Sequence, residues 1–104
     1  MNEIDFPIDQ IPAEITALGR TVADRVAGPG VVDEIAVSID VDSTDRVVYR
    51  FDFLLDPGRL TISLGELHSG LRRQLSHALY EMQDPRYPIV RLAERADWAK
   101  LGHA

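Results

Sequence analysis

Apolar and polar residues alternate in two runs of the chain, and this period of two is the clearest pattern in the sequence. The first run covers residues 34–41 and the second covers residues 47–55. Such alternation is typical of β-strands that bury one face. The apolar positions are Ile35, Val37, Ile39 and Val41, followed by Val47, Tyr49, Phe51, Phe53 and Leu55. The pattern predicts two strands joined as a hairpin.

The parity of the two runs predicts the register of this hairpin. The apolar residues are odd-numbered in both runs, and directly opposed residues of an antiparallel pair share a face. We therefore expect Val41 opposite Val47, and Val37 opposite Phe51. This pairing needs a loop of odd length, and Ser43-Thr44-Asp45 provides one.

A change to helical spacing predicts one helix on each side of the strands. Apolar residues recur every three or four positions over residues 12–27 and again over residues 64–83. At the start of the second helix, Ser63 and Glu66 have the spacing of a capping box. Gly70 lies inside this helix, where glycine costs about 1 kcal/mol relative to alanine. It therefore indicates either close packing at that point or no particular role.

Three shorter elements are predicted from the rest of the chain. Residues 60–64 alternate after the turn residues Asp56-Pro57-Gly58, which predicts a third antiparallel strand. Residues 87–92 predict a fourth, short strand, and residues 93–101 predict a short helix. Residues 86–104 have three open placements: at the edge of their own sheet, on its other face, or on another subunit.

Together these elements predict a single α+β domain over residues 1–104. We expect an antiparallel meander of three to four strands with the two main helices packed on one face, in the order α-β-β-β-α-(β)-(α). A length of 104 residues and a hydrophobic fraction of 45% are ordinary for one globular domain with its own core.

The charge balance disfavours some classes of partner. The chain has 17 acidic and 11 basic residues, which gives a formal net charge of −6. Binding to nucleic acid depends on Lys and Arg side chains that replace counterions on phosphates. We therefore expect no nucleic-acid partner, and the same repulsion disfavours docking on an anionic membrane. A charged protein partner is expected to be basic.

Cysteine content and the start of the chain bear on chemistry and compartment. The absence of cysteine excludes disulfides, thiolate metal sites and cysteine catalysis, and it suits a reducing compartment. Residues 1–12 carry no Lys or Arg, unlike the basic start of a secretory signal. No apolar stretch has the length of a membrane span. We therefore expect a cytoplasmic protein that needs no metal or other cofactor.

One short motif resembles a catalytic loop. Asp40-Val41-Asp42-Ser43-Thr44 resembles the D-x-D-x-T loop of haloacid-dehalogenase-like phosphatases, in which the first Asp is the nucleophile and the second an acid/base. That family continues from the motif into a helical crossover, whereas an alternating strand follows directly in this sequence. We therefore interpret the motif as a polar hairpin turn.

The second predicted helix carries the residues of an alternative candidate site. His68 shares a face with Arg72, and Arg73 shares a face with His77, each pair one turn apart. Such residues would suit an anion or a small ligand. His68 and His77 are nine positions apart, so they point to opposite sides of the helix and do not chelate one metal ion.

The leading functional hypothesis is a small, acidic, non-enzymatic module that binds a protein, as an adaptor, an inhibitor or an assembly subunit. A homodimer is a further expectation, because unpaired strand edges invite pairing. The alternative hypothesis is a ligand-binding or anion-binding protein, or an enzyme, with its site around residues 64–83. The residues expected at an interface are Val48, Leu54, Tyr87 and Trp98.

Overall fold

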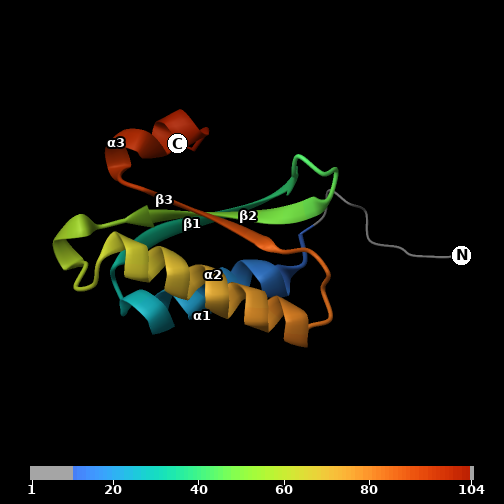
Figure 1. Cartoon of the computed structure of the whole chain (residues 1–104). Coiled ribbons are helices and arrows are strands. Elements are labelled where there is room, and N and C mark those ends of the chain that lie inside the picture. The colour runs from blue at the N-terminus through green and yellow to red at the C-terminus, as the bar shows by residue number, and fades with distance from the viewer. Residues whose placement is uncertain (1–10, 104) are drawn as a thin grey trace, which may run out of the picture.

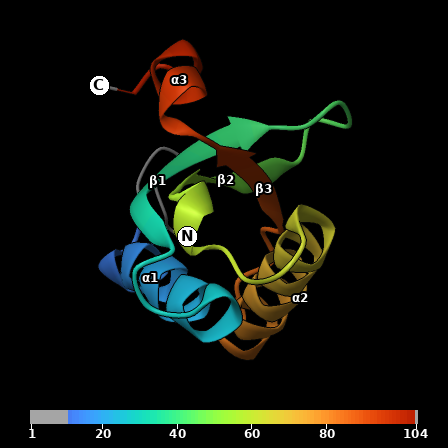
Figure 2. The same cartoon turned by 90° about the vertical axis from the view of Figure 1, so that its left-hand side faces the viewer.

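The computed structural model describes residues 11–103 as one three-stranded sheet with helices on both of its faces (Figures 1 and 2). The helices are α1 (Ala13–Ala27), α2 (Leu64–Glu81) and α3 (Arg95–Trp98), and the strands are β1 (Val32–Val41), β2 (Val47–Leu55) and β3 (Pro88–Ala93). Two short 3-10 helices are η1 (Pro57–Arg59) and η2 (Ala99–Leu101). The strand order is β1-β2-β3. The two long helices lie on one face, and α3 lies on the other.

The hairpin of β1 and β2 has the predicted antiparallel register. Val41 pairs with Val47, and Val37 pairs with Phe51. The prediction from the parity of the apolar positions is therefore confirmed. One irregularity interrupts the register near the start of β1, between Val32 and Glu34, which is the kind of local bulge that often occurs at a sheet edge.

The main core lies between the sheet and the two long helices. Phe51 and Phe53 of β2 are fully buried there and stack with their ring centroids 6.2 Å apart. α1 adds the buried side chains of Ile15 and Val22. α2 adds a stripe of buried leucines at every fourth position, namely Leu67, Leu71, Leu75 and Leu79. Removal of these apolar surfaces from water is what holds both helices on this face.

Both long helices lie where the periodicity predicts them, and the capping box of α2 is confirmed. The Ser63 hydroxyl accepts a hydrogen bond from the Glu66 backbone N–H at 3.1 Å, and the Glu66 carboxylate accepts one from the Ser63 N–H at 3.1 Å. These two bonds satisfy donors that the first helical turn leaves without an intrahelical partner.

The predicted third strand is wrong, and the antiparallel meander is wrong with it. Residues 60–64 form no strand, and Leu60 and Ile62 instead pack against the core from the loop before α2. So short an alternation does not distinguish a strand from a loop that places two apolar side chains in the core. The third strand of the sheet is β3, which pairs parallel to β2 with Val90 beside Phe51.

The parallel pairing follows from the connection between β2 and β3. The predicted turn at residues 56–58 does not reverse a strand, because it becomes η1, with the Asp56 carboxylate accepting a hydrogen bond from the Gly58 N–H. The chain then runs through α2. A helical crossover of this kind returns the next strand in the same direction as the first. The observed order is therefore α-β-β-α-β-α, and the sheet is mixed.

The C-terminal residues that the structure describes pack on their own domain. β3 completes one edge of the sheet, and α3 with η2 lies over the face opposite the long helices. Gly102 follows η2 in the left-handed conformation, with φ of 95°, which glycine adopts without steric cost. Within residues 11–103, no helix combines the length and the apolar character needed to cross a membrane.

Close contact between α1 and α2 explains the glycine inside the second helix. A Cβ atom at Gly70 would lie 2.8 Å from the Cγ1 atom of Val26, which is shorter than two carbon atoms pack. Gly70 therefore has a packing role. Gly65 lies in the first turn of the same helix, and a Cβ atom there would meet nothing closer than the Ser63 hydroxyl at 3.9 Å.

We predict that Gly70→Ala and Gly65→Ala change stability in opposite directions. Gly70→Ala should lower the free energy of unfolding by about 1 kcal/mol, because the strain of overpacking exceeds the gain in helix propensity. Gly65→Ala should raise it by up to about 1 kcal/mol, because it brings the gain without the strain. Urea denaturation followed by circular dichroism measures both variants. Stabilisation by both substitutions would show that the helices are not in close contact at Gly70.

Candidate functional site

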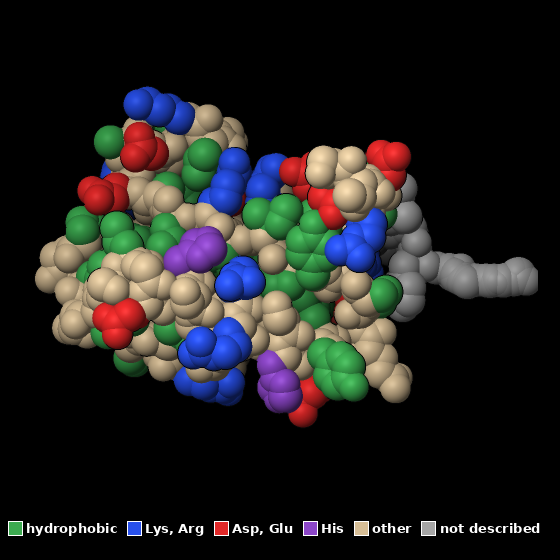
Figure 3. Space-filling view, viewed as in Figure 1, with side chains coloured by type: hydrophobic (Ala, Val, Ile, Leu, Met, Phe, Trp, Pro, Cys, Tyr) green, Lys and Arg blue, Asp and Glu red, His purple; other side chains and the backbone are tan. Residues whose placement is uncertain are grey.

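The residues of the predicted site on α2 do not come together around one cavity. The His68 ring nitrogen Nε2 lies 3.0 Å from the backbone oxygen of Val90, so this side chain is hydrogen-bonded to β3. His77 lies 3.5 Å from Glu81 on the same helix. Figure 3 shows basic and histidine side chains spread over this face of the molecule. Arg72, Arg73 and His77 are exposed.

An open groove of about 590 Å³ between α1 and α2 includes only one of these four residues, Arg73. His68 and His77 are not brought together, as their nine-residue spacing indicates. Among residues 11–103, no cluster of His, Asp and Glu side chains is arranged to hold a metal ion. The geometry therefore supplies no further reason to place a ligand site on α2.

Three of the residues predicted at an interface are inside the molecule. Val48, Leu54 and Trp98 are each at most 2% exposed. Trp98 and Leu54 form a second, smaller core with Ala93, between the sheet and the C-terminal segment. These side chains are covered by the chain's own residues and expose almost no surface to a partner.

Tyr87, the fourth residue predicted at an interface, is half-buried. It links the start of β3 to the hairpin turn through a side-chain hydrogen bond. Its hydroxyl donates a hydrogen bond to the Asp42 carboxylate. The same carboxylate accepts hydrogen bonds from the backbone N–H groups of Thr44 and Arg46. The bond from Tyr87, followed by the bond from the Arg46 backbone, holds the pKa of Asp42 well below its usual range.

This turn accounts for the D-x-D-x-T motif. An acid/base catalyst works best with a pKa near the pH at which it operates, and the pKa of Asp42 is moved away from that range. The Asp40 carboxylate is also engaged, because it accepts hydrogen bonds from the Val41 N–H at 2.8 Å and from Arg50 at 2.6 Å. The contacts favour the interpretation of residues 40–44 as a structural turn.

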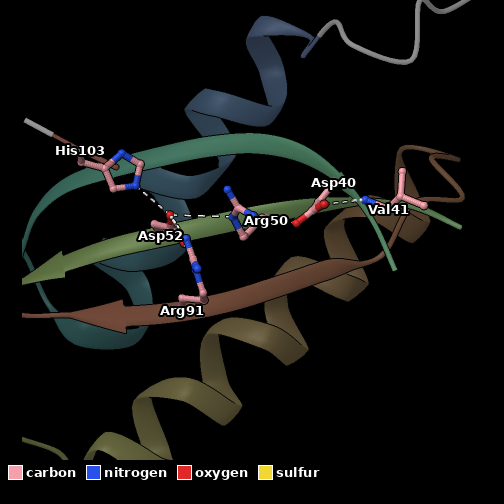
Figure 4. A network of polar contacts seen from close by, with 6 residues as sticks. All are labelled: Asp40, Val41, Arg50, Asp52, Arg91 and His103. Carbon is pink, nitrogen blue, oxygen red and sulfur yellow. Dashed lines mark hydrogen bonds and ion pairs between the residues drawn. The ribbon is translucent and has the colours of Figure 1, made fainter. Parts of the chain in front are cut away.

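A network of charged side chains lies on the outer face of the sheet, which is the face opposite α1 and α2 (Figure 4). It connects β2, β3 and the C-terminal segment. Asp52 of β2 is only 1% exposed and accepts two hydrogen bonds from Arg91 of β3, at 2.7 and 2.8 Å. The His103 ring lies 2.8 Å from the same carboxylate and 4.2 Å, between ring centroids, from Trp98. Arg50 lies between Asp52, at 4.0 Å, and Asp40.

The network keeps Asp52 ionised. Burial by itself raises the pKa of the Asp52 carboxyl, but the hydrogen bonds from Arg91 and His103 outweigh it, and the pKa lies below its ordinary value of 3.8. A buried carboxylate with these partners is suited to holding β2, β3 and the C-terminal segment together. It is poorly suited to accepting a proton near neutral pH.

The sequence pattern alone does not indicate this network. Asp52 occupies an even position in β2, where the alternation indicates only a polar face. Arg91 reaches it because the parallel register places Arg91 beside Asp52, and that register was not predicted. The only signal in the sequence is that a charged residue lies between Phe51 and Phe53 in the most apolar strand.

The backbone of β2 determines which groups remain free at the two edges of the sheet. The N–H of Tyr49 donates to the carbonyl of Tyr87, so odd-numbered backbone groups of β2 point toward β3. The N–H of Asp42 donates to the carbonyl of Arg46. The hydrogen bonds of the β1–β2 ladder are therefore exchanged between even-numbered residues of the two strands. Odd-numbered backbone groups of β1 therefore point away from the sheet.

The outer edge of β3 is short and partly closed. β3 has six residues, and Pro88, Val90 and Leu92 are the ones whose backbone groups point outward. Pro88 has no N–H to donate. The carbonyl of Val90 is hydrogen-bonded to His68 of the neighbouring α2. A proline and a covering helix are two of the devices by which natural sheets block further pairing.

The outer edge of β1 is long and open in its middle. At one end, Arg20 of α1 donates to the carbonyl groups of Val32, at 2.7 Å, and Asp33, at 3.3 Å. At the other end, the N–H of Val41 is bonded to the Asp40 carboxylate. Between these ends, the outward N–H and C=O groups have no hydrogen-bond partner among residues 11–103. They belong to Ile35, Val37 and Ile39.

The side chains of β1 do not protect this edge either. The strand has ten residues and contains neither Pro nor Lys nor Arg, the residues that commonly block an edge. Ile35, Val37 and Ile39 are half-buried, and Val41 is 53% exposed. A long, apolar and unprotected edge strand is a surface that favours the addition of another strand.

We predict that Asp52→Asn lowers the free energy of unfolding by about 2–4 kcal/mol. Removing one partner of a buried ion pair leaves the other charge without compensation, and Arg91 retains some exposure to water that moderates the loss. Asp40→Asn is the matched control, because Asp40 is half exposed and its ion pair should contribute less than about 1 kcal/mol. Equal losses in urea denaturation of the two variants would contradict a special role of Asp52.

We also predict a pH dependence that Asp52→Asn weakens. A carboxyl whose pKa is lower in the folded state than in the unfolded state stabilises the fold above the unfolded value, here 3.8. This stabilisation is lost as the pH falls through the folded pKa. The free energy of unfolding of the unmodified chain should therefore fall steeply below about pH 4, and that of Asp52→Asn less steeply. Parallel curves between pH 2 and pH 7 would show that Asp52 has no shifted pKa.

Comparison with known proteins identifies no relative: no protein-family model, no curated protein and no solved structure matches this chain.

Proposed function

We propose that this chain is a non-enzymatic protein-binding module that binds an extended segment of another protein along the open edge of β1. The observation that carries the proposal is the row of backbone groups at Ile35, Val37 and Ile39 that have no hydrogen-bond partner within residues 11–103, whereas the opposite edge of the sheet, at β3, is short and partly closed. An added strand would satisfy these donors and acceptors and cover the half-buried side chains of the same residues.

The free energy of adding a strand at this edge is expected to give binding of moderate affinity. Each hydrogen bond made to the edge contributes about 0.5–1.5 kcal/mol net, and burial of apolar side chains adds about 25 cal/mol for each Å² removed from water. Ordering an extended segment opposes both contributions. Binding of this kind suits an adaptor, an inhibitor or an assembly subunit that recognises a short stretch of its partner.

Charge favours a foreign basic segment over a second copy of this chain. Two copies carry a formal charge of −6 each and repel each other. In a symmetric dimer, the β1 strands of two copies would pair antiparallel. The register that places the most apolar side chains opposite one another has Ser38 on the two-fold axis, with Val37 opposite Ile39 and Ile35 opposite Val41. It places Glu34 of one copy opposite Asp42 of the other at both ends, and directly opposed like charges destabilise a strand pair.

A photo-crosslinking amino acid placed in the full chain in its native cells tests the proposal. At position Val41, beside the open edge, it should capture another protein, and at position Arg72, on α2, it should not capture the same protein. Val37→Pro should abolish the capture. Proline removes an N–H that points outward, so no hydrogen bond of the β1–β2 ladder is lost.

Two further variants keep this test decisive. Ser38→Pro removes an N–H that belongs to the ladder, so it should lower the thermal midpoint much more than Val37→Pro. If Val37→Pro does not fold, Val37→Lys blocks the edge with a charge instead. Capture of a second copy, or capture that persists in a folded variant with a blocked edge, would overturn the proposal.

A further inference from the structure

The two sides of the open edge differ in chemistry. On the side of the long helices, the edge ends in the half-buried side chains of Ile35, Val37 and Ile39, which pack against the main core. α1 lies directly beneath them, because a Cβ atom at Gly19 would lie 3.2 Å from Ile35, and Leu18 is half-buried there. Side chains that an added strand places on this side would extend an apolar layer.

On the face opposite the long helices, the open edge has an acidic side chain at each end and small side chains between them. Glu34 lies at one end with its side chain 52% exposed, and Asp40 lies at the other with its side chain 46% exposed. Ala36 and Ser38 lie between them and have small side chains. Asp33 adds an exposed carboxylate next to Glu34, with no ion-pair partner among residues 11–103.

The neighbouring cations do not remove this acidity. Within residues 11–103, Glu34 forms an ion pair with Arg95 alone, at 3.5 Å, and both side chains are more than half exposed. Such surface pairs contribute little and exchange easily. Asp40 is paired with Arg50, which is shared with Asp52. Two carboxylates therefore remain available to a cation that approaches each end of the edge.

Resting on the proposed function, we infer that the segment bound at β1 is an amphipathic strand with a basic residue at each end. Residues directly opposite one another share a face. Positions opposite Ile35, Val37 and Ile39 should therefore be apolar, and positions opposite Glu34 and Asp40 should be Lys or Arg. The segment reads basic, apolar, any, apolar, any, apolar, basic over seven residues.

This pattern is the same in both chain directions, so it holds for parallel and antiparallel addition alike. Its length also agrees with the part of the edge that is free. Arg20 occupies the carbonyl groups before Glu34, and Asp40 occupies the N–H of Val41. Between these two contacts lie the groups that no described residue occupies, and they set the stretch over which a segment can add its hydrogen bonds.

Three synthetic peptides, titrated into the isotope-labelled full chain at low salt, test the inference. KVTVTVR has the inferred pattern. KVVVTTR has the same composition without the alternation, and EVTVTVE has the alternation with acidic ends. KVTVTVR should shift the backbone amide signals of Ile35, Val37 and Ile39 and should bind at least about tenfold more tightly than either control. Its affinity should fall as salt is added.

Two charge-reversing variants localise the effect. Glu34→Lys should weaken the binding of KVTVTVR by about threefold or more, because it replaces an attraction with a repulsion. Glu81→Lys makes the same change of net charge at the end of α2, away from the edge, and should leave the affinity unchanged. Equal weakening by both variants would reduce the effect to net charge and overturn the inference.

The remaining outcomes separate the inference from the proposed function. If all three peptides bind the edge equally well, strand addition is right and the inferred chemistry is wrong. If no peptide shifts the edge amides while crosslinking at Val41 still captures a partner, the proposed function stands and the inference fails. If neither peptides nor crosslinking engage the edge, both are wrong.

Discussion

The backbone of β2 is the constraint on which the rest of the structure depends. Its even-numbered groups pair with β1 and, over residues 49–54, its odd-numbered groups pair with β3, so both sides of the central strand are used along that stretch. This division fixes the outward groups of β1 at odd positions, which are also the positions of its apolar side chains. The same residues, Ile35, Val37 and Ile39, therefore offer both backbone pairing and an apolar surface to an added strand.

The difference between the two edges follows from the helix beside each one. α2 is the crossover that places β3 parallel to β2, and the same helix occupies one outward carbonyl group of β3, that of Val90, through His68. α1 is connected to β1 by a short loop and packs beneath the strand, and its Arg20 reaches only the first carbonyl groups. One edge is thus partly closed by the helix that precedes it, and the other is left open over its middle by the residues that the structure describes.

Local patterns in the sequence predict the hairpin, its register and the two long helices, because alternation, helical spacing and the capping residues Ser63 and Glu66 act over short distances. The parallel strand could not be predicted in this way. Leu60 and Ile62 show the same alternation as a strand, and only competition for the free edge of β2 decides in favour of β3. The Asp52 network depends on that long-range choice, because the parallel register brings Arg91 beside Asp52, so it is not visible in the sequence.

Asp40 shows how binding at the edge and stability of the fold can remain compatible. One carboxylate oxygen accepts from the Val41 N–H and the other accepts from Arg50. Each oxygen of an ionised carboxylate can accept a second hydrogen bond. A basic residue arriving with an added strand can therefore use the remaining acceptor sites without displacing Arg50, and the network around Asp52 stays intact. Occupation of the edge would then add to the charged layer on the outer face rather than compete with the contacts that hold β3 and the C-terminal segment in place.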